Sequence, residues 1–419
     1  MTEHSVQLQT RPSRKGLLSG IRVLDFSRHL PGPFATRRLA EMGAEVVKVE
    51  QPGGDPGRHI GPHVGEVGAL FAVSHLGKKS ICLDLRKKAD RDTALRLAAA
   101  ADVVVESFLP GKMAEWGLDY AAVRAVNPGV VYCSVTGYGQ SGEWADRPGH
   151  DLNFLAASGL LAALAGPSAP PSVPGLPLAD LIGGMAAAEA IVAALVRRER
   201  TGEGAHLDIA VTDHLMGLAA LPILLGQSGG SEALARFLRG TVCYNVYATR
   251  DGRHVALAAL EEKFWRAFCE ANGRPEWLPH QFAPADPDNP VYRAVAELFA
   301  ARTRDEWAAF ARGVDCCLTP VYAPEETLDG EYATSRRLAV QVMPAGNASA
   351  RGAKAEGTGG GMRMPCTAAG RLVEGGEEES GRWPGLHEHA EAVLQAWLAQ
   401  GNGSAEPEQR ATPSARRPG

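Results

Sequence analysis

The sequence has no long uninterrupted apolar run, no cysteine pair of the CxxC type and no marked excess of either charge. Its apolar stretches near 152–166, 176–196 and 209–226 are short or broken by polar residues, so none offers the roughly 20 apolar residues of a membrane span. The seven cysteines lack zinc-type spacing, which argues against a metal site and fits a reduced compartment. The first residues lack the apolar core of a secretory signal, so we expect a cytoplasmic protein.

The charge balance argues against a further group of functions. The 43 basic and 48 acidic side chains give a formal net charge of -5, which provides no general attraction to nucleic acid or to an anionic membrane. The 419 residues, 45% of them hydrophobic, are enough for two or three domains with cores of their own. We therefore expect a globular protein that binds any anion locally, with no nucleic-acid partner, no membrane partner and no metal.

The hydrophobic pattern of the first half alternates between strands and helices. Residues 21–27 (IRVLDFS) and 45–50 (EVVKVE) are rich in branched side chains and flank a helical stretch at 34–42, and the same rhythm continues to about residue 139. Strands that alternate with helices are typical of a parallel sheet. Farther along, apolar residues recur at spacings of 4, 3, 4 and 3 from Leu181 to Leu195, which predicts an amphipathic helix that begins at Asp180.

The second half predicts a different organisation. After residue 230, the stretches 243–249 and 254–260 surround the turn-like RDGR and predict a hairpin, which helices near Phe264 and Trp307 follow. The pattern therefore predicts a smaller α+β domain. The full set of predicted parts is a disordered leader at 1–16, the N-terminal part of a large domain at 17–225, the small domain at 226–335, a linker at 336–383, a helix that returns to the large domain at 384–398 and a disordered tail at 399–419.

Several phrases, in order and over most of residues 17–398, resemble the family III CoA-transferases, which include formyl-CoA transferase and alpha-methylacyl-CoA racemase. Among them are LSGIRVLDFSRHLPGPF, ADVVVESFLPGKM, SVTGYGQSGEWADRPGHD, ERTGEGAHLDIAVTD and DGRHVALAALE. The resemblance implies an α/β fold with a Rossmann-like parallel-sheet large domain and a smaller α+β domain, in an interlocked homodimer. It also implies that coenzyme A enters as part of the substrate and that no cofactor is bound permanently.

The phrase Gly149, His150, Asp151 precedes the helical run 152–164, where unpaired N–H groups and the helix dipole favour negative charge such as that of an enolate. In the racemase branch, the His of this phrase works with an Asp that resembles Asp180, one base on each face of the substrate α-carbon. That branch also has a Glu, here Glu261, that orients the His by a hydrogen bond to one ring nitrogen. The resemblance therefore implies epimerisation of a 2-methylacyl-CoA by two-base proton transfer.

In the transferase branch, the Asp of the same phrase attacks the thioester and forms an acyl anhydride, so Asp151 implies a CoA-transferase as the alternative. Typical transferases have an aromatic residue before that Asp. The imidazole of His150 can act as a base near neutral pH and an aromatic ring cannot, which favours the racemase. A third hypothesis, a non-catalytic acyl-CoA binding protein, does not require three ionisable groups at these positions.

The resemblance also implies a CoA site. In the family, the GKKS region lies by the CoA phosphates, so Lys78 and Lys79 are candidate CoA-binding residues. Two positions depart from the family pattern, because Leu109 and Gln51 stand where arginines are usual. All of these residues also have purely structural interpretations: His150, Asp151 and Asp180 as residues that cap helices, and Glu261, Lys78 and Lys79 as solvated charges.

Overall fold

The computed structural model describes residues 16–165, 170–230, 240–343, 362–365 and 381–399. By its internal contacts the chain forms two compact units. The first unit contains Met1–Phe154, Pro177–His214 and Val340–Gly419, and the second contains Leu155–Leu176 and Leu215–Ala339. The predicted leader up to residue 15, the tail from residue 400 and, within the predicted linker, 344–361 and 366–380 lie outside the described residues.

The first unit is built on a six-stranded sheet in the order β5-β2-β1-β6-β7-β8, and every neighbouring pair in it is parallel. The predicted parallel sheet is confirmed. Because all strands run the same way, their carboxyl ends meet at one edge of the sheet, where ligands bind in open α/β sheets. The strands are β1 (Arg22–Asp25), β2 (Glu45–Glu50), β5 (Lys79–Cys82), β6 (Val103–Glu106), β7 (Val131–Thr136) and β8 (Ala205–Ala210).

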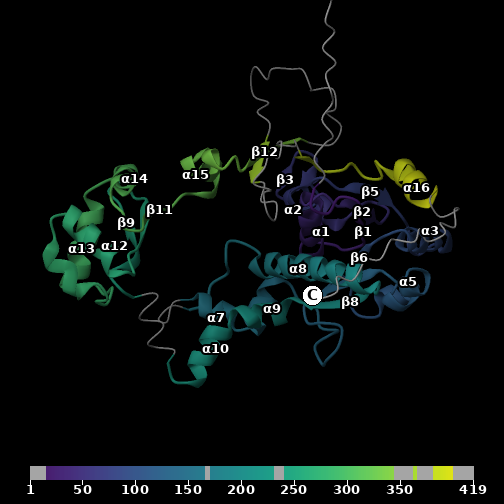
Figure 1. Cartoon of the computed structure of the whole chain (residues 1–419), viewed down its shortest axis with the longest axis horizontal. Helices are drawn as coiled ribbons and strands as arrows, with labels where there is room; N and C mark the ends of the chain where they lie inside the picture. Colours follow the sequence, from purple (N-terminus) through teal and green to yellow (C-terminus); the bar gives the residue numbers. More distant parts are fainter. Residues whose placement is uncertain (1–15, 166–169, 231–239, 344–361, 366–380, 400–419) are drawn as a thin grey trace, which may run out of the picture. The chain divides into compact units, whose positions relative to one another are not determined.

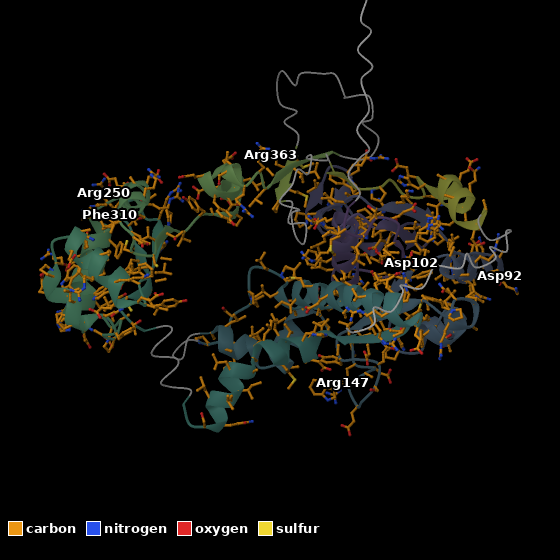
Figure 2. The ribbon with its side chains drawn as sticks, in the orientation of Figure 1. Asp92, Asp102, Arg147, Arg250, Phe310 and Arg363 are labelled. Carbon is orange, nitrogen blue, oxygen red and sulfur yellow. The ribbon has the colours of Figure 1, made fainter. Side chains whose placement is uncertain are left out.

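One set of helices packs with alternate strand residues such as Leu24, Val47 and Val104 in a continuous apolar core. The C-terminal helix contributes Val393 and Trp397 to this core, so the end of the described chain is part of the first unit. Asp102, labelled in Figure 2, accepts a hydrogen bond from the backbone N–H of Arg22 at 2.8 Å just before β6 begins. The helices on this side are α3 (Lys88–Ala99), α4 (Lys112–Glu115), α5 (Tyr120–Val126) and α16 (Ala390–Leu398).

The helices α1 (Pro31–Glu41) and α8 (Leu178–Thr201) pack against each other, and α8 also contacts β7 and β8 (Figure 1). The close approach depends on two glycines of α8. A Cβ atom at Gly184 would lie 2.6 Å from the carbonyl oxygen of Pro31, and one at Gly183 would lie 2.6 Å from a methyl group of Val211. Gly184 thus lets the beginning of α1 lie close to α8, and Gly183 does the same for the beginning of α9 (Val211–Leu218).

The long helix α8 corrects two expectations. It begins at Leu178, two residues before the predicted start at Asp180, with Pro177 in the N-cap position. With 24 residues it is also the one helix in the described chain that is long and apolar enough to cross a membrane, because Asp180 and Glu189 do not interrupt it. Its small buried residues, such as Ala187 and Ala188, pack in the interior of the unit as those of a core helix do.

The second unit contains the antiparallel sheet β11-β10-β9, in which β9 (Tyr244–Ala248) and β10 (His254–Ala258) form the predicted hairpin. Its core gathers aromatic side chains such as Trp265, Phe299 and Trp307. The remaining elements of this unit are α7 (Leu160–Leu164), α10 (Ala220–Gln227), α12 (Glu262–Ala271), α13 (Pro290–Ala300), α14 (Arg304–Gly313), β11 (Leu318–Pro320) and α15 (Glu331–Ser335), and α9 (Val211–Leu218) spans the boundary.

Short strands occur inside the predicted linker. β12 (Ala339–Met343) pairs in parallel with β14 (Gly381–Arg382), and β13 (Met362–Pro365) lies on the other side of β12 in the same small sheet. Trp383, which follows β14, is buried with Phe71 of α2 (Ala69–Ser74) in a separate apolar cluster. The two described ends of this segment are therefore anchored on the first unit.

Candidate functional site

His150 lies immediately before helix α6 (Asp151–Ala157), and its backbone is fixed by Asn153. The N–H of His150 donates to the side-chain oxygen of Asn153 at 3.0 Å, and the carbonyl of His150 accepts the N–H of Asn153 at 2.8 Å. The His150 side chain is exposed. The imidazole of His150 is thus accessible to a ligand, and the backbone that carries it is fixed.

One aromatic ring determines where this helix begins. A Cβ atom at Gly137 would lie 2.1 Å from the ring of Phe154, and one at Gly149 would lie 2.6 Å from it, so the ring packs directly on both backbones. Tyr138 meets the same ring edge to face at 5.3 Å between centroids. Phe154 therefore holds both ends of the loop that joins β7 to α6, and with it the position of His150.

The helical run predicted at 152–164 is divided in the structure. Helix α6 ends at Ala157, and α7 begins at Leu160 after Gly159, whose φ of 78° is left-handed. The hydroxyl of Ser158 accepts the N–H of Leu160 at 3.3 Å, which satisfies a donor at the new start. The sequence pattern missed this break because apolar residues continue across it. The dipole at His150 and Asp151 is therefore that of a two-turn helix.

The carboxylate of Asp151 contacts the beginning of α8, 29 residues farther along the chain. Its Oδ1 accepts the backbone N–H of Asp180 at 3.0 Å. Asp180 is the third residue of α8, so this N–H is one of the first-turn donors that have no partner within the helix. Asp151 and Asp180 are thus in direct contact, and His150 adjoins Asp151 in the chain.

Asp180 has a strongly perturbed carboxyl group. Burial raises its pKa from the usual 3.8 to about 7, and the neighbouring carboxylate of Asp151 adds to the rise. Both effects disfavour the charged form, because a buried anion loses hydration and a second anion nearby repels it. A carboxyl with a pKa near 7 can both give and take a proton at neutral pH.

His29 is a further titratable group near this site, and the sequence analysis did not single it out. It follows β1 at the carboxyl edge of the sheet and has a left-handed φ of 64°. Burial lowers the pKa of His29; Asp55 opposes this effect, and the charge of His150 adds to it. The signal that could have found it is a histidine in the short connection between a buried strand and the PGP triplet that begins the next helix, where ligands of parallel sheets bind.

Glu261, the fourth predicted catalytic residue, belongs to the second unit. It precedes α12, and its carbonyl accepts the N–H groups of Phe264 and Trp265 at 3.0 and 3.2 Å. Its side chain is exposed and makes no capping hydrogen bond. The pairing of Glu261 with His150 stays a prediction.

The two lysines predicted at the CoA phosphates have different surroundings. The Nζ of Lys78 is buried and donates to Asp25 at 3.0 Å, to the carbonyl of Pro33 at 2.8 Å and to the hydroxyl of Thr36 at 2.7 Å. Burial lowers the pKa of Lys78 to about 8, although Asp25 opposes this effect. All three donors of its ammonium are used inside the protein. We therefore do not include Lys78 among the groups that face a ligand.

Lys79 keeps an exposed side chain that pairs with Glu45 at 2.5 Å. A surface pair of this kind contributes little to stability and can exchange its partner. Lys79 is, however, the first residue of β5, toward the amino end of that strand and away from the carboxyl edge of the sheet, and its predicted role at the CoA phosphates stays a prediction.

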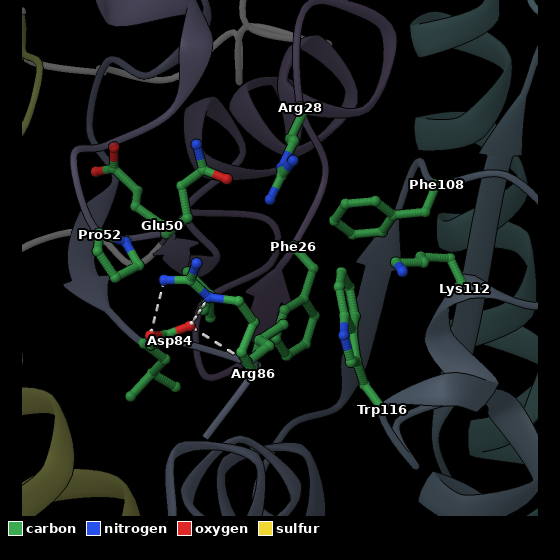
Figure 3. A pocket seen from close by; sticks show the side chains of 13 residues that line it. Phe26, Arg28, Glu50, Pro52, Asp84, Arg86, Phe108, Lys112 and Trp116 are labelled. Atoms are coloured by element: carbon green, nitrogen blue, oxygen red, sulfur yellow. Dashed lines mark hydrogen bonds and ion pairs between the residues drawn. The ribbon is translucent and has the colours of Figure 1, made fainter. Parts of the chain in front are cut away.

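A cavity of about 440 Å³ opens near the carboxyl ends of β1, β2 and β6, all in the first unit. Figure 3 shows Arg86 bridged to Asp84 on one wall, with an Nε to Oδ1 distance of 2.7 Å, and Phe108 and Trp116 edge to face at 5.1 Å on the other. The wall residues also include Phe26, Arg28, Val49, Glu50, Gln51, Pro52, Leu83, Leu85 and Lys112.

Cationic and aromatic groups dominate this cavity. Arg28 lies 4.8 Å over the ring of Phe108, and the Nζ of Lys112 lies 5.1 Å from the ring of Trp116. Glu50 is neutralised by Arg58, at 2.7 Å. Flat apolar rings beside several cations suit a ligand that carries both a ring system and phosphate groups. Sequence reasoning did not identify Arg86, Lys112 or Trp116 as site residues, because the fold brings the loop after β5, which carries Arg86, together with α4, which carries Lys112 and has Trp116 as its C-cap.

A parallel α/β sheet with titratable groups and a cavity at its carboxyl edge defines an α/β enzyme architecture. The chain belongs to the CoA-transferase family III, whose family model matches residues 18–364. Members of this family are acyl-CoA racemases or CoA-transferases, so the chain is an enzyme of one of these two kinds.

Three relatives illustrate the match. The chain is 35% identical over 274 residues to acetyl-CoA:oxalate CoA-transferase of Acetobacter aceti. The matched residues cover 64% of this chain and 70% of that protein. It is 32% identical over 349 residues to human alpha-methylacyl-CoA racemase, which covers 78% of this chain and 85% of that protein. The crystal structure of a CAIB/BAIF family protein from Brucella suis superposes with a TM-score of 0.77 at 27% identity and covers 92% of this chain and 100% of that chain.

Proposed function

We propose that this enzyme epimerises the α-carbon of a 2-methylacyl-CoA by two-base proton transfer through an enolate. The observation that carries the proposal is the contact between Asp151, next to His150, and the backbone of Asp180, whose carboxyl has a pKa of about 7. Inversion at carbon requires one group that removes the α-proton and another that returns a proton to the opposite face. An imidazole and a carboxyl that titrates near neutrality have the chemistry for these two roles.

In one direction, neutral His150 takes the α-proton and becomes an imidazolium, and the electrons of the C–H bond move into the enolate. The protonated carboxyl of Asp180 then gives its proton to the other face and becomes a carboxylate. When the opposite epimer reacts, the carboxylate of Asp180 takes its α-proton and the imidazolium of His150 gives its proton to the other face. Both groups then regain their starting protonation. The role of Glu261, which the resemblance implies orients His150, stays a prediction from the sequence.

We place the CoA portion of the substrate in the cavity lined by Arg86, Lys112 and Trp116. The rings of Phe108 and Trp116 suit the adenine, and the two cations suit the phosphates. Gln51, which lines the same cavity, stands where the family has an arginine. Arg86 and Lys112 therefore supply the positive charge that this chain lacks at residue 51.

Removal of either cation should weaken substrate binding without changing the chemistry. We expect Arg86→Ala and Lys112→Ala each to raise KM for an acyl-CoA roughly tenfold with kcat nearly unchanged, because a phosphate contact is equally strong in the ground and transition states. Steady-state kinetics with an acyl-CoA and with its 3′-dephospho analogue would measure this effect. The control is Lys88→Ala, which removes an exposed lysine of α3 that pairs with Asp92 outside the cavity. Equal KM values for all three variants and the wild type would contradict the placement.

The second candidate function is transfer of CoA between two carboxylic acids through an anhydride of Asp151. The 35% identity to acetyl-CoA:oxalate CoA-transferase favours it, as does the position of the Asp151 carboxylate beside the candidate bases. Against it, Oδ1 of Asp151 already accepts a backbone N–H, which reduces its reactivity as a nucleophile. A non-catalytic acyl-CoA binding protein is disfavoured, because binding alone does not require a buried carboxyl with a pKa near 7.

We further propose a homodimer in the cytoplasm, without a membrane or nucleic-acid partner and without a permanently bound cofactor. Exposed apolar side chains on α9 and α10, among them Leu218 at 58% and Leu224 at 62% exposure, support burial against a second copy. The six cysteines of the described residues are free, which supports a reducing compartment.

Proton NMR of a 2-methylacyl-CoA in deuterium oxide tests the function, in the presence and absence of an acceptor acid. We expect loss of the α-proton signal and appearance of the opposite epimer without an acceptor. If the α-proton is retained but the CoA moves to the acid, and hydroxylamine traps an acyl group on Asp151, the chain is a transferase. If neither the α-proton exchanges nor the thioester changes after long incubation, the binding-protein hypothesis is supported instead.

A further inference from the structure

Two carboxyl groups meet at the beginning of α8: that of Asp180, in its first turn, and that of Asp151, which accepts the backbone N–H of Asp180. Oδ1 of Asp151 accepts the N–H of Asp180 at 3.0 Å, and this N–H belongs to the first turn of a 24-residue helix. The free N–H groups and the dipole of a long helix stabilise negative charge at its beginning. Of the two carboxyl groups, Asp151 is therefore the one whose contact suits a carboxylate.

The carboxyl of Asp180 is in the opposite situation. Burial and the charge of Asp151 are the two causes that raise its pKa to about 7. Other titratable groups near the site, among the described residues, include His150, which adjoins Asp151, and His29, which precedes α1. His29 is influenced by His150, Asp55, Arg28 and Lys48. Two carboxyl groups this close do not ionise together at low cost, so the first to ionise keeps the other protonated.

We propose that Asp151 is a positioning residue: its carboxylate, docked on the first turn of α8, fixes that turn beside His150 and makes Asp180 the proton donor of the site. The inference rests on the proposed function, because it assigns which of the two bases of that reaction holds the proton before the substrate reacts. It gives Asp151 a role that requires no covalent bond to the substrate. It also explains why Asp151, which adjoins the candidate base His150, accepts a hydrogen bond from Asp180, the other candidate base.

The simpler interpretation is that Asp151 only caps α8. A cap acts through its acceptor oxygen, whereas the proposed role also needs the negative charge. Asp151→Asn separates the two, because the side-chain oxygen of asparagine can still accept the N–H of Asp180 but carries no charge. Asp151→Ser is a second variant that retains an acceptor and removes the charge, should the first fail to fold.

The experiment is a carbon-13 NMR titration of the aspartate carboxyl groups of the full chain, in which Asp180→Asn identifies the Asp180 resonance. We expect a midpoint near pH 7 in the wild type, as the raised pKa implies, and a midpoint lower by about one pH unit in Asp151→Asn and Asp151→Ser. The bell-shaped pH profile of α-proton exchange should move to lower pH in the same variants. The matched control is Asp119→Asn, which changes the cap of α5 in the same way but far along the chain from Asp180.

The outcomes separate this inference from the proposed function. An unchanged Asp180 midpoint in both Asp151 variants, with exchange retained, would overturn the role of Asp151 and leave the epimerase intact. Complete loss of activity in both variants, together with an acyl group trapped on Asp151 in the wild type, would overturn both, because Asp151 would then be a nucleophile. A lowered midpoint with a shifted exchange profile supports the inference.

Discussion

His150→Ala should lower the rate of α-proton exchange in deuterium oxide by roughly 10³-fold, because general base catalysis by a positioned side chain contributes about 10² to 10⁴. The expected loss lies in kcat, since the exposed ring of His150 is not among the residues that line the proposed CoA cavity. Binding of the acyl-CoA should therefore stay within about twofold of the wild type. The exchange rate is measured by proton NMR and the binding by calorimetry with the same thioester.

The control for this variant is His206→Ala. His206 is also an exposed histidine of the first unit, stacked on Tyr120 at 4.8 Å between ring centroids, but it is the second residue of β8 and so lies toward the amino end of that strand. The proposed site is at the carboxyl edge of the sheet. Exchange should be retained in His206→Ala. Normal exchange in His150→Ala would remove His150 from the mechanism, whereas equal losses in both variants would indicate a general effect on folding.

Asp180→Asn should have the second large effect, and it should change activity and stability in opposite directions. Without its carboxyl the site loses one of the two proposed bases, so the epimerisation rate should fall by about 10² to 10⁴. The amide has nearly the shape of a protonated carboxyl but cannot ionise, so it also removes the cost of a buried charge. A loss of activity together with a gain of stability would show that the carboxyl of Asp180 destabilises the fold and is needed for the reaction.

The stability effect has a definite pH dependence. The pKa of Asp180 is about 7 in the folded protein, against 3.8 as its ordinary value, so the folded state holds this proton more tightly than the unfolded state. The destabilisation is therefore absent below about pH 4, grows as the pH rises and is complete above about pH 7. Asp180→Asn should raise the free energy of unfolding by roughly 2 to 4 kcal/mol at pH 8 and by little at pH 4.

Urea unfolding of the wild type and Asp180→Asn at both pH values measures this difference. The control is Asp119→Asn, whose carboxylate caps α5 and should give no gain at pH 8. Equal stability of wild type and Asp180→Asn at pH 8 would contradict a half-buried Asp180 carboxyl whose charged form is disfavoured.

Local patterns were enough to predict most elements of the first unit. The helical stretch expected at 34–42 corresponds to α1 at Pro31–Glu41, and the alternation of strands and helices correctly predicted a parallel sheet. These features depend on residues close together in the chain. The break at Gly159 was missed because a left-handed φ leaves no periodic trace when apolar residues continue on both sides.

Features that depend on distant partners could not be read from the pattern. Lys78 resembled a phosphate ligand by its motif, but Asp25, 53 residues away, pairs with it inside the protein. The bond from Asp180 to Asp151 likewise joins two helix beginnings 29 residues apart. The family resemblance identified these residue types in order, and only the fold shows which of their atoms meet.

The ring of Phe154 has a consequence for how this enzyme can be altered. Because the ring contacts the backbone at both Gly137 and Gly149, it isolates the geometry of His150 from the stretch between them. The Oδ2 of Asp208 also accepts the N–H of Gln140 at 3.0 Å, which fixes the backbone near the start of this stretch. We therefore expect that residues 141–148 can lengthen, shorten or change in sequence while the backbone of His150 stays in place.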